Sequence, residues 1–463
     1  MNPINPRTVF MPLWYDDCSS QRLRFDLRKS KRFTEASAKL EFIEGMRALA
    51  ALYVVVSHFC SMVIPSDSAR FNQTKGTLLA NAMGAFRNGH LAVAAFIVLS
   101  GFCLQYGLFQ RGDGRVYGLG GFFKRRGLRI LPAYYATLAL SVGICYWVTW
   151  PNKDIRPFDT YVKASSGLPV TLDSLLAHVF LIQNLSMDWM YRINGALWSI
   201  SIEAQLYLLF PWLILVMQKR SPIQLLLLIS IPSLLIAAYV PGAAKMYSWF
   251  AILFVAGMMA AHYAHRPDPV KGLKPAYGFA IFWAGLLSTF YMVYQQAVVG
   301  NSLDATTLIA SDLTCGFATA AFLYSATISP GGLAQRALSA RWLVRIGVAS
   351  YSLYLIHHPL LQAIYVYRPA WAATPELETA YLLAVALPAI VVAALVFSWV
   401  FERPFVKSYL PAPSTVDDHQ LYQLPLKPLD HATMESYAYL EGESKEASRE
   451  RNASKRGRKA KLY

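Results

Sequence analysis

Charged side chains are scarce in this sequence: they make up 15% of its 463 residues, whereas an average soluble domain has about 25%. Only five cysteines are present and no Cys-x-x-Cys pair occurs, so a zinc or redox site of that kind is not expected. A His-Glu-x-x-His pattern and internal repeats are also missing. These absences exclude a disulfide-rich secreted domain and a solenoid, and they argue against a large soluble fold.

Apolar residues are abundant instead, with 55% hydrophobic and 14% aromatic side chains and a mean hydropathy of +0.33. A membrane span needs about 20 mostly apolar residues, and a backbone in lipid must bond internally, which favours helices. The apolar stretch 172–184 is too short to span and is expected to be interfacial or re-entrant. We predict an all-α fold, a polytopic transmembrane helix bundle of about ten spans, over 45–64, 90–109, 130–149, 195–217, 223–240, 247–264, 276–298, 305–328, 346–366 and 379–401.

Basic residues, which give the chain a net charge of +16, predict its orientation. With the N-terminus in the cytosol, the cytosolic loops hold 14 basic residues in 53 positions, and the opposite loops hold 9 in 94. Such an excess is typical of cytosolic loops, so both termini are expected inside. The chain then divides into a basic cytosolic tail (1–42), a membrane-embedded domain (43–408) and a disordered cytosolic tail (409–463).

Polar groups inside the predicted spans are expected to be functional, because lipid makes them costly. Arg47 and His58 are eleven positions apart, so they share a helix face and lie about 16 Å apart along the axis. Ser199 and Glu203 share a face of the fourth segment. The predicted depths of His58 and Glu203 match, and a histidine beside a carboxylate can act as a general base.

Three more residues are expected at or near this depth and are predicted to bind substrate. Asp312 lies in the eighth segment, and Tyr354 and His357 lie in the ninth. The histidines and carboxylates come from different segments without a metal-binding spacing, so no metal site is expected.

A basic cluster precedes the third segment and contains Arg125, Arg126 and Arg129. Arg126 and Arg129 are three positions apart and face the same way on a helix. A helix N-terminus with adjacent arginines favours anions, so this cluster predicts a site for a phosphate-rich cytosolic ligand. The alternative is a positive-inside anchor that contacts lipid headgroups.

Six short motifs occur in the order found in the acyltransferase-3 family of membrane O-acyltransferases, which the chain resembles over 41–408. These motifs are Arg47-x10-His58, the run Phe96 to Phe102, Arg126-x-x-Arg129, the phrase Leu197 to Glu203, the phrase Ser350 to His357, and Glu402-Arg403-Pro404. In one departure, Ala92-Val93-Ala94 stands where the family has Gly-Val-Asp, so any role of that acid is lost.

The resemblance implies transfer of an acyl group from an acyl-CoA, expected to be acetyl-CoA, onto a hydroxyl. No cofactor is expected to be bound permanently. The coenzyme A phosphates would bind Arg126 and Arg129, with Arg125 and Arg47 as lesser candidates. His58, Glu203 and Ser199 would be catalytic: His58 would deprotonate the acceptor and Glu203 would orient or stabilise it, although an acyl-histidine intermediate is an open alternative.

The acceptor and partners are less defined by the sequence. A small lipophilic acceptor such as a secondary metabolite is expected, with a sterol, another lipid or a glycan as alternatives. The expected partners are the acyl-CoA, this acceptor and the bilayer, with no nucleic acid and no obligate protein partner. Two rival classes are a proton-coupled transporter or channel, with His58, Glu203 and Asp312 on its path, and a non-catalytic sterol or lipid receptor.

Two further signals concern location. Asn72 and Asn184 begin Asn-x-Ser/Thr sequons in loops predicted to be non-cytosolic, which predicts glycosylation. The final residues, Lys459 to Tyr463, are similar to a Lys-x-Lys-x-x retrieval signal. Together they favour the endoplasmic reticulum or another internal membrane.

Overall fold

The computed structural model describes residues 40–407, apart from gaps at 65–71, 73, 75, 112–113, 117, 150, 152–167, 241, 243–245, 266–273 and 300–303. Almost all of both predicted tails, including Lys459 and Lys461, therefore lies outside the described residues. The chain divides into two units, Met1–Tyr409 and Leu410–Tyr463, and every described helix belongs to the first.

The described residues form helices and no strands, which confirms the all-α prediction. Each of the ten predicted segments coincides with a helix. The helices are α2 (Glu41–Val63), α5 (Gly89–Arg111), α6 (Leu119–Ile144) with the π-turn η1 (Cys145–Thr149), α11 (Trp198–Lys219), α12 (Pro222–Tyr239), α13 (Phe250–His265), α14 (Pro275–Val299), α15 (Ala305–Ile328), α18 (Ser350–Val366), and the continuous rod α19 (Pro375–Tyr381), η4 (Leu382–Ala386), α20 (Leu387–Phe397), η5 (Ser398–Glu402) and α21 (Arg403–Lys407).

Eight helical stretches in the described part are long and apolar enough to cross a membrane. Two of the ten predicted spans fall short of that length, since α13 has 16 residues and α18 has 17. The number of spans and the inward orientation of the termini therefore stay predictions.

Shorter helices fill the connections: α4 (Leu78–Gly84), α9 (Leu172–Val179), η2 (Gln183–Leu185), α10 (Met187–Met190), α16 (Leu333–Leu338) and α17 (Arg341–Val348). The apolar stretch 172–184 forms α9 and the start of η2. Tyr134 and Tyr135 of α6 donate hydrogen bonds of 2.8 Å to the carbonyls of His178 and Val179. The stretch thus packs against the side of α6.

The third helix begins earlier than the sequence predicts. It starts at Leu119 instead of residue 130, after Gly118, whose left-handed backbone (φ 68°) precedes the first turn. Glycine adopts this conformation without the steric cost that other residues meet. The arginine cluster therefore lies two to three turns inside α6, so its predicted place at a helix N-terminus is wrong, and its binding of an anion stays a prediction.

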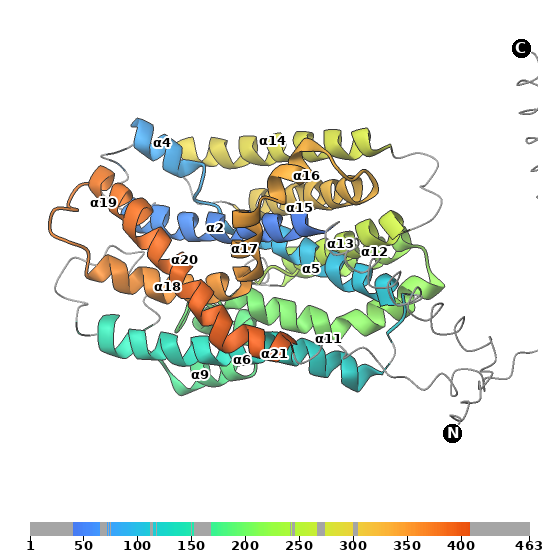
Figure 1. The fold of residues 1–463 in the computed structure, drawn as a ribbon, viewed down its shortest axis with the longest axis horizontal. Coiled ribbons are helices and arrows are strands. Elements are labelled where there is room, and N and C mark those ends of the chain that lie inside the picture. Colours follow the sequence, from blue (N-terminus) through green and yellow to red (C-terminus); the bar gives the residue numbers. More distant parts are fainter. Residues whose placement is uncertain are drawn as a thin grey trace, which may run out of the picture. The chain divides into compact units, whose positions relative to one another are not determined.

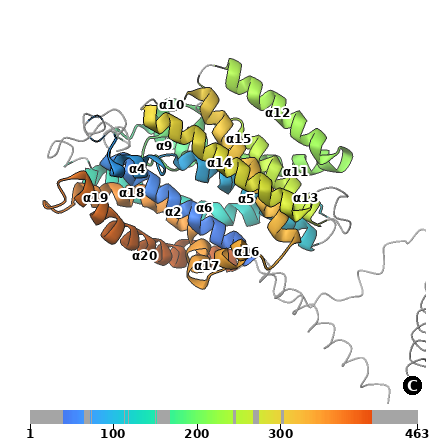
Figure 2. The same cartoon turned by 90° about the horizontal axis from the view of Figure 1, so that it is seen from above.

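The centre of the bundle is formed by α5 with α2, α13 and α15. A side chain at Gly101 or Gly257 would collide with the backbone of the opposing helix, so α5 and α13 approach as closely as glycine permits. Figures 1 and 2 show the long helices side by side, and Figure 2 shows α12 and α20 at opposite edges. In the helical stretch Leu78–Gln110, 61% of the apolar segment is buried, whereas in α14 only 17% is buried. The first is therefore a core helix and α14 is a peripheral one.

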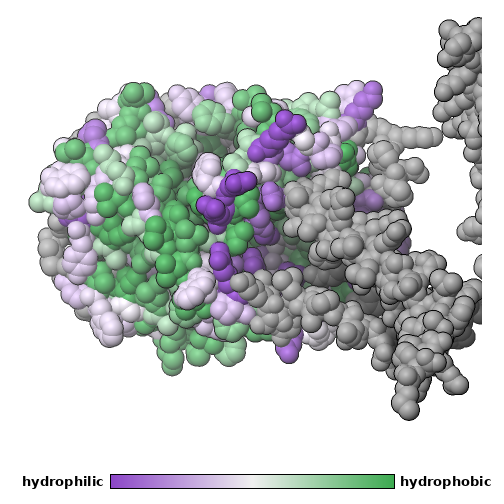
Figure 3. All heavy atoms as spheres, in the orientation of Figure 1, coloured by the Kyte–Doolittle hydropathy of each residue, from purple (hydrophilic) through white to green (hydrophobic). Residues whose placement is uncertain are grey.

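The peripheral helices present apolar side chains outward, as a lipid-facing surface requires. Trp283 of α14 and Val392 of α20 are examples of exposed large hydrophobic residues. Figure 3 shows hydrophobic residues over much of one face, with hydrophilic residues gathered near α16 and α17. These two helices carry the exposed basic residues Arg336, Arg341 and Arg345.

Candidate active site

One face of α11 carries a row of polar side chains. Ser199, Glu203 and Tyr207 are four residues apart, so they lie one above another along the helix. At one end, the hydroxyl of Ser199 lies 2.6 Å from the hydroxyl of Tyr354 on α18. Tyr354 also donates a 3.0 Å hydrogen bond to the carbonyl of Ala196. The structure thus brings together Ser199 and Tyr354, which the sequence places in different segments.

Beyond Tyr354 lies a histidine cluster of His58 on α2 with His357 and His358 on α18. The ring centre of His58 is 5.1 Å from that of His357 and 5.0 Å from that of His358. The Nδ1 atom of His357 donates to the carbonyl of Tyr354 at 2.6 Å. The Nε2 of His357 and both ring nitrogens of His358 have no hydrogen-bond partner among the described residues. Buried polar groups are normally paired, so these nitrogens mark a place for a ligand or for proton transfer.

Gly195 provides the space that His358 occupies. A Cβ atom at Gly195 would lie 3.3 Å from both Cε1 and Nε2 of the His358 ring. The loop before α11 therefore packs directly against the histidine cluster, and a larger residue there would displace it.

Glu203 does not pair with His58 as the sequence predicts. Among the described residues, its Oε1 atom accepts hydrogen bonds from Ser100 at 2.7 Å and from Tyr207 at 2.5 Å. The Ser100 and Tyr207 hydroxyls are 2.8 Å apart. The matching depths of His58 and Glu203 are not accompanied by facing side chains, because the carboxylate points toward α5 while the imidazole meets α18.

The arginines gather at the Tyr207 end of the row. Arg47 lies 3.1 Å from Oε1 of Glu44 and 3.6 Å from the sulfur of Cys103. The Arg126 guanidinium stands 5.9 Å from the centre of the Tyr207 ring, within cation–π range. Arg47 and Arg126 come from α2 and α6, so the predicted convergence of basic groups from separate segments is present.

Arg129 and Arg125 are placed differently. The Arg129 guanidinium lies 3.1 Å from Oε1 of Glu402, whose Oε2 accepts hydrogen bonds from Ser352 at 2.7 Å and Ser398 at 3.1 Å. A carboxylate therefore offsets the charge of Arg129. Arg125 is turned about 100° from Arg126 on the same helix. Arg47 also has a carboxylate neighbour, but the Glu44 side chain is 29% exposed and can turn to solvent, whereas that of Glu402 is 2% exposed. Arg47 and Arg126 are therefore the better candidates for an anionic ligand.

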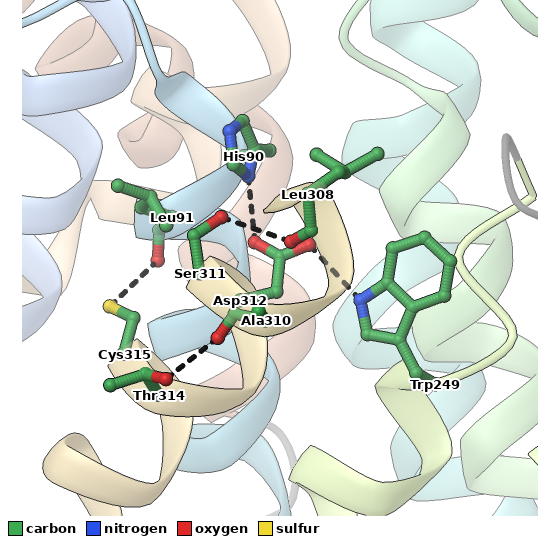
Figure 4. Close-up of polar contacts among 9 residues, drawn as sticks. All are labelled: His90, Leu91, Trp249, Leu308, Ala310, Ser311, Asp312, Thr314 and Cys315. Atoms are coloured by element: carbon green, nitrogen blue, oxygen red, sulfur yellow. Dashed lines mark hydrogen bonds and ion pairs between the residues drawn. The ribbon is translucent and has the colours of Figure 1, made fainter. Parts of the chain in front are cut away.

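Asp312 pairs with a histidine that the sequence analysis did not select. Its Oδ1 lies 2.7 Å from Nδ1 of His90, and its Oδ2 accepts a 3.0 Å hydrogen bond from Nε1 of Trp249 (Figure 4). His90 is the second residue of α5, and an ionisable residue at the start of a predicted span was the signal that could have found it.

The two sequons differ in accessibility. Asn72 is exposed. Asn184 is 3% exposed, its amide donates to Gln205 at 3.2 Å, and its carbonyl accepts from Gln205 at 2.8 Å. A glycan on Asn184 would displace these contacts.

The arrangement as a whole is a polar row with different chemistry at its two ends. Cations lie at one end, a carboxylate with two hydroxyls lies in the middle, and imidazoles lie at the other end. Within the part of the chain that the structure describes, no group of three or more His, Cys, Asp or Glu residues could hold a metal ion. The row is suited to holding an anionic ligand at one end and handling protons at the other.

Comparisons with known proteins agree with the motifs. The chain is 26% identical over 356 residues to the peptidoglycan O-acetyltransferase OatA of Listeria monocytogenes, covering 72% of this chain and 51% of that protein. It is 25% identical over 355 residues to the O-acetyltransferase OatA of Staphylococcus aureus, covering 69% of this chain and 50% of that protein. The chain thus spans about half the length of these bacterial relatives.

No solved structure shows significant similarity to the chain. The family model described as an acyltransferase domain matches residues 40–403, which include the whole polar row and both histidine sites. The chain therefore belongs to the acyltransferase-3 family of membrane-embedded O-acyltransferases.

Proposed function

We propose that this protein transfers an acyl group, taken to be acetyl, from an acyl-CoA to a hydroxyl of an acceptor. The observation that carries the proposal is the row on α11, in which Ser199, Glu203 and Tyr207 join the arginine end to the histidine end. A donor with a phosphorylated head and a reactive thioester at the end of an extended arm matches such a row.

The phosphorylated head is assigned to Arg47 and Arg126. Guanidinium groups bind phosphate through charge-assisted hydrogen bonds. Arg126 lies beside the Tyr207 ring and Arg47 lies beside the Cys103 sulfur, near the centre of the bundle. Arg47 and His58 lie on the same helix, eleven residues or about 16 Å apart. The thioester end would therefore extend along α2 toward the histidines.

His58 is assigned to the thioester. In one course, its imidazole accepts the proton of the acceptor hydroxyl while the new C–O bond forms and the C–S bond breaks, and the thiolate then takes up that proton. In the other, the imidazole attacks the thioester carbonyl and thiolate leaves. The acceptor oxygen then attacks the acyl carbon, the bond from that carbon to the ring nitrogen breaks, and the acceptor's proton goes to the thiolate. Tyr354 gives its one proton to the carbonyl of Ala196, so Ser199, whose hydroxyl lies 2.6 Å from it, is the group assigned to turn and donate a hydrogen bond to the thioester carbonyl oxygen as negative charge develops there.

The proposed acceptor is a compound that carries a free hydroxyl group. A small lipophilic molecule such as a secondary metabolite fits a site buried among membrane helices, and sterols or other lipids share that property. A glycan is the alternative that the relatives support, since one of them is named a peptidoglycan O-acetyltransferase.

The test uses the full chain in membranes from cells that overproduce it. Radiolabelled acetyl-CoA is added with a solvent extract of cells that lack the protein, and labelled ester and free coenzyme A thiol are measured. We expect ester formation by the wild type and a loss of about 10²–10⁴-fold in His58→Gln.

The matched control is His265→Gln, which changes an exposed histidine at the end of α13 and should leave the rate unchanged. Equal rates for His58→Gln and the wild type would remove His58 from the mechanism. A wild type that moves protons or solutes across vesicles but consumes no thioester would overturn acyl transfer in favour of transport.

A further inference from the structure

A second histidine–carboxylate unit lies apart from the row on α11. Asp312 is fully buried on α15, and the His90 side chain at the start of α5 is 11% exposed. The carboxylate uses one oxygen for Nδ1 of His90 and the other for the indole of Trp249. Figure 4 shows the imidazole meeting Asp312 edge-on, with its second nitrogen on the far side of the ring.

This geometry fixes the chemistry of the His90 ring. A carboxylate that accepts from Nδ1–H holds the imidazole in the tautomer whose Nε2 carries a lone pair, and it stabilises the imidazolium that forms when Nε2 takes a proton. Nε2 of His90 is buried and has no hydrogen-bond partner among the described residues. A carboxylate on Nδ1 together with an unpartnered Nε2 is the arrangement expected of a general base.

The pair lies at the same level as the histidine cluster. A side chain at Gly89 would lie 2.9 Å from the hydroxyl of Ser57, so α5 and α2 touch at these two residues. His90 and His58 are the residues that immediately follow them, and consecutive Cα atoms are about 3.8 Å apart. The two imidazoles therefore come from adjacent positions across one helix contact.

Backbone strain gathers at the same end of the bundle. In the described ranges, three non-glycine residues have positive φ angles: Leu181 (55°), Ile193 (64°) and Tyr247 (55°). Ile193 leads into α11, and Tyr247 stacks on Trp198 at 4.3 Å and lies 5.2 Å from the Trp249 ring. Such conformations cost free energy and cluster at binding sites.

From these observations we infer that His90, oriented by Asp312, is the base that accepts the proton of the acceptor hydroxyl. This inference rests on the proposed acyl transfer. The acceptor O–H bond breaks, its proton goes to Nε2 of His90, and its oxygen forms the ester bond to the acyl carbon. The C–S bond of the thioester breaks in the same reaction, and the proton passes from His90 to the released thiolate.

The assignment defines the roles of the two histidine sites. Since His90 takes the proton of the acceptor hydroxyl, the assignment selects the second of the two courses given for His58, in which its imidazole attacks the thioester carbonyl. His90 lies on α5, where its ring meets Asp312 of α15, and it serves the acceptor, which is a neutral hydroxyl and needs no cationic partner. Asp312 acts through His90 and is a positioning residue.

The experiment compares His90→Gln and Asp312→Asn with Cys315→Ala. Cys315 lies one turn from Asp312, and its thiol contacts the carbonyl of Leu91 at 3.6 Å, so its removal changes another contact between α15 and α5 without touching the pair. The probes are radiolabelled acetyl-CoA and the solvent extract of cells lacking the protein. Ester formation is measured as kcat and as KM for acetyl-CoA, and thermal unfolding is followed in detergent.

We expect kcat to fall about 10²–10⁴-fold in His90→Gln and Asp312→Asn, with KM for acetyl-CoA within twofold of wild type and Tm close to it. Cys315→Ala should keep its kcat. Asp312→Glu, which retains the carboxylate, should recover part of the loss.

Ester formation at the wild-type rate by His90→Gln, or equal rate losses in Asp312→Asn and Cys315→Ala, would overturn the role of His90. Should His90→Gln fail to fold, Asp312→Asn decides alone, because the Asn side chain preserves the volume at that site. A wild type that forms no ester overturns the proposed function itself, whatever the variants do.

Discussion

The guanidinium of Arg129 lies 3.1 Å from a carboxylate oxygen of Glu402, although the two residues are far apart in the sequence. The π-turn η5 positions Glu402 in the bundle, where it is 3% exposed and also accepts hydrogen bonds from Ser352 and Ser398. This pair joins the R-x-x-R motif of α6 to the Glu-Arg-Pro motif at the end of the rod. It indicates that Arg126 and Arg129, the two arginines of the R-x-x-R motif, have different roles.

Arg129→Gln and Arg126→Gln are therefore expected to separate stability from donor binding. Losing Arg129 leaves a buried carboxylate with two serine donors, so we expect a destabilisation of about 1–3 kcal/mol and a Tm lower by several degrees. Losing Arg126 removes a charge-assisted contact worth about 1.5–3 kcal/mol, which corresponds to a KM for acetyl-CoA about 10–100-fold higher. Thermal unfolding and steady-state kinetics measure the two effects. The reverse pattern would assign Arg129 to the donor and Arg126 to the fold.

Tyr354→Phe tests the contact between α11 and α18. The change keeps the ring but removes the hydroxyl that lies 2.6 Å from Ser199 and donates to Ala196. We expect a rate loss of at least about tenfold, and no further loss on adding Ser199→Ala, because residues in one hydrogen-bond unit are not additive. Tyr351→Phe is the control: its hydroxyl donates to the carbonyl of Ile130 at 3.0 Å, so its loss should lower Tm but not the rate of folded protein. Additive losses in the double variant would show that Ser199 and Tyr354 act separately.

The sequence predicts where the helices lie because hydrophobic length is a local property. It also predicts the separation of arginines from histidines, since position along a helix gives depth directly. It does not predict which side chains face each other, because that depends on the rotation and packing of each helix. Glu203 is the clearest example: its predicted depth matches that of His58, but its bonds go to Ser100 and Tyr207.

The same reasoning explains the residues that were missed. His90 is the first residue of a predicted span, and the sequence alone predicts an interfacial histidine there. Only the fold shows that Asp312 lies 2.7 Å from it. The sequence predicts that Arg129 binds a ligand, because Glu402, which lies beside it in the fold, comes from the far end of the domain. Conversely, Ser199 and Tyr354 were each selected from their own helix, and the fold brings them into contact.

Asn184 is expected to stay unmodified in a host that glycosylates proteins. Both its amide nitrogen and its amide oxygen bond to Gln205, and the side chain is buried. Asn184→Gln should therefore leave electrophoretic mobility unchanged before and after endoglycosidase treatment, and it should lower Tm because the pair with Gln205 is disturbed. A mobility shift that disappears in Asn184→Gln would show that this loop is open to the modifying enzyme.

Gly195→Ala tests whether the position of His358 matters for turnover. The added methyl group would lie 3.3 Å from two atoms of the His358 ring, so the ring must move by a few tenths of an ångström, and its centre lies 5.0 Å from that of His58. Because a misplacement of about 1 Å can cost about 10²-fold in rate, we expect this smaller shift to lower kcat about tenfold with little change in KM for acetyl-CoA. Gly107→Ala is the matched control, since nothing lies within 4 Å of a Cβ there and alanine should stabilise the helix by about 0.5–1 kcal/mol. If Gly195→Ala retains the wild-type kcat, the histidine cluster tolerates displacement, and the placement of His358 is not part of the mechanism.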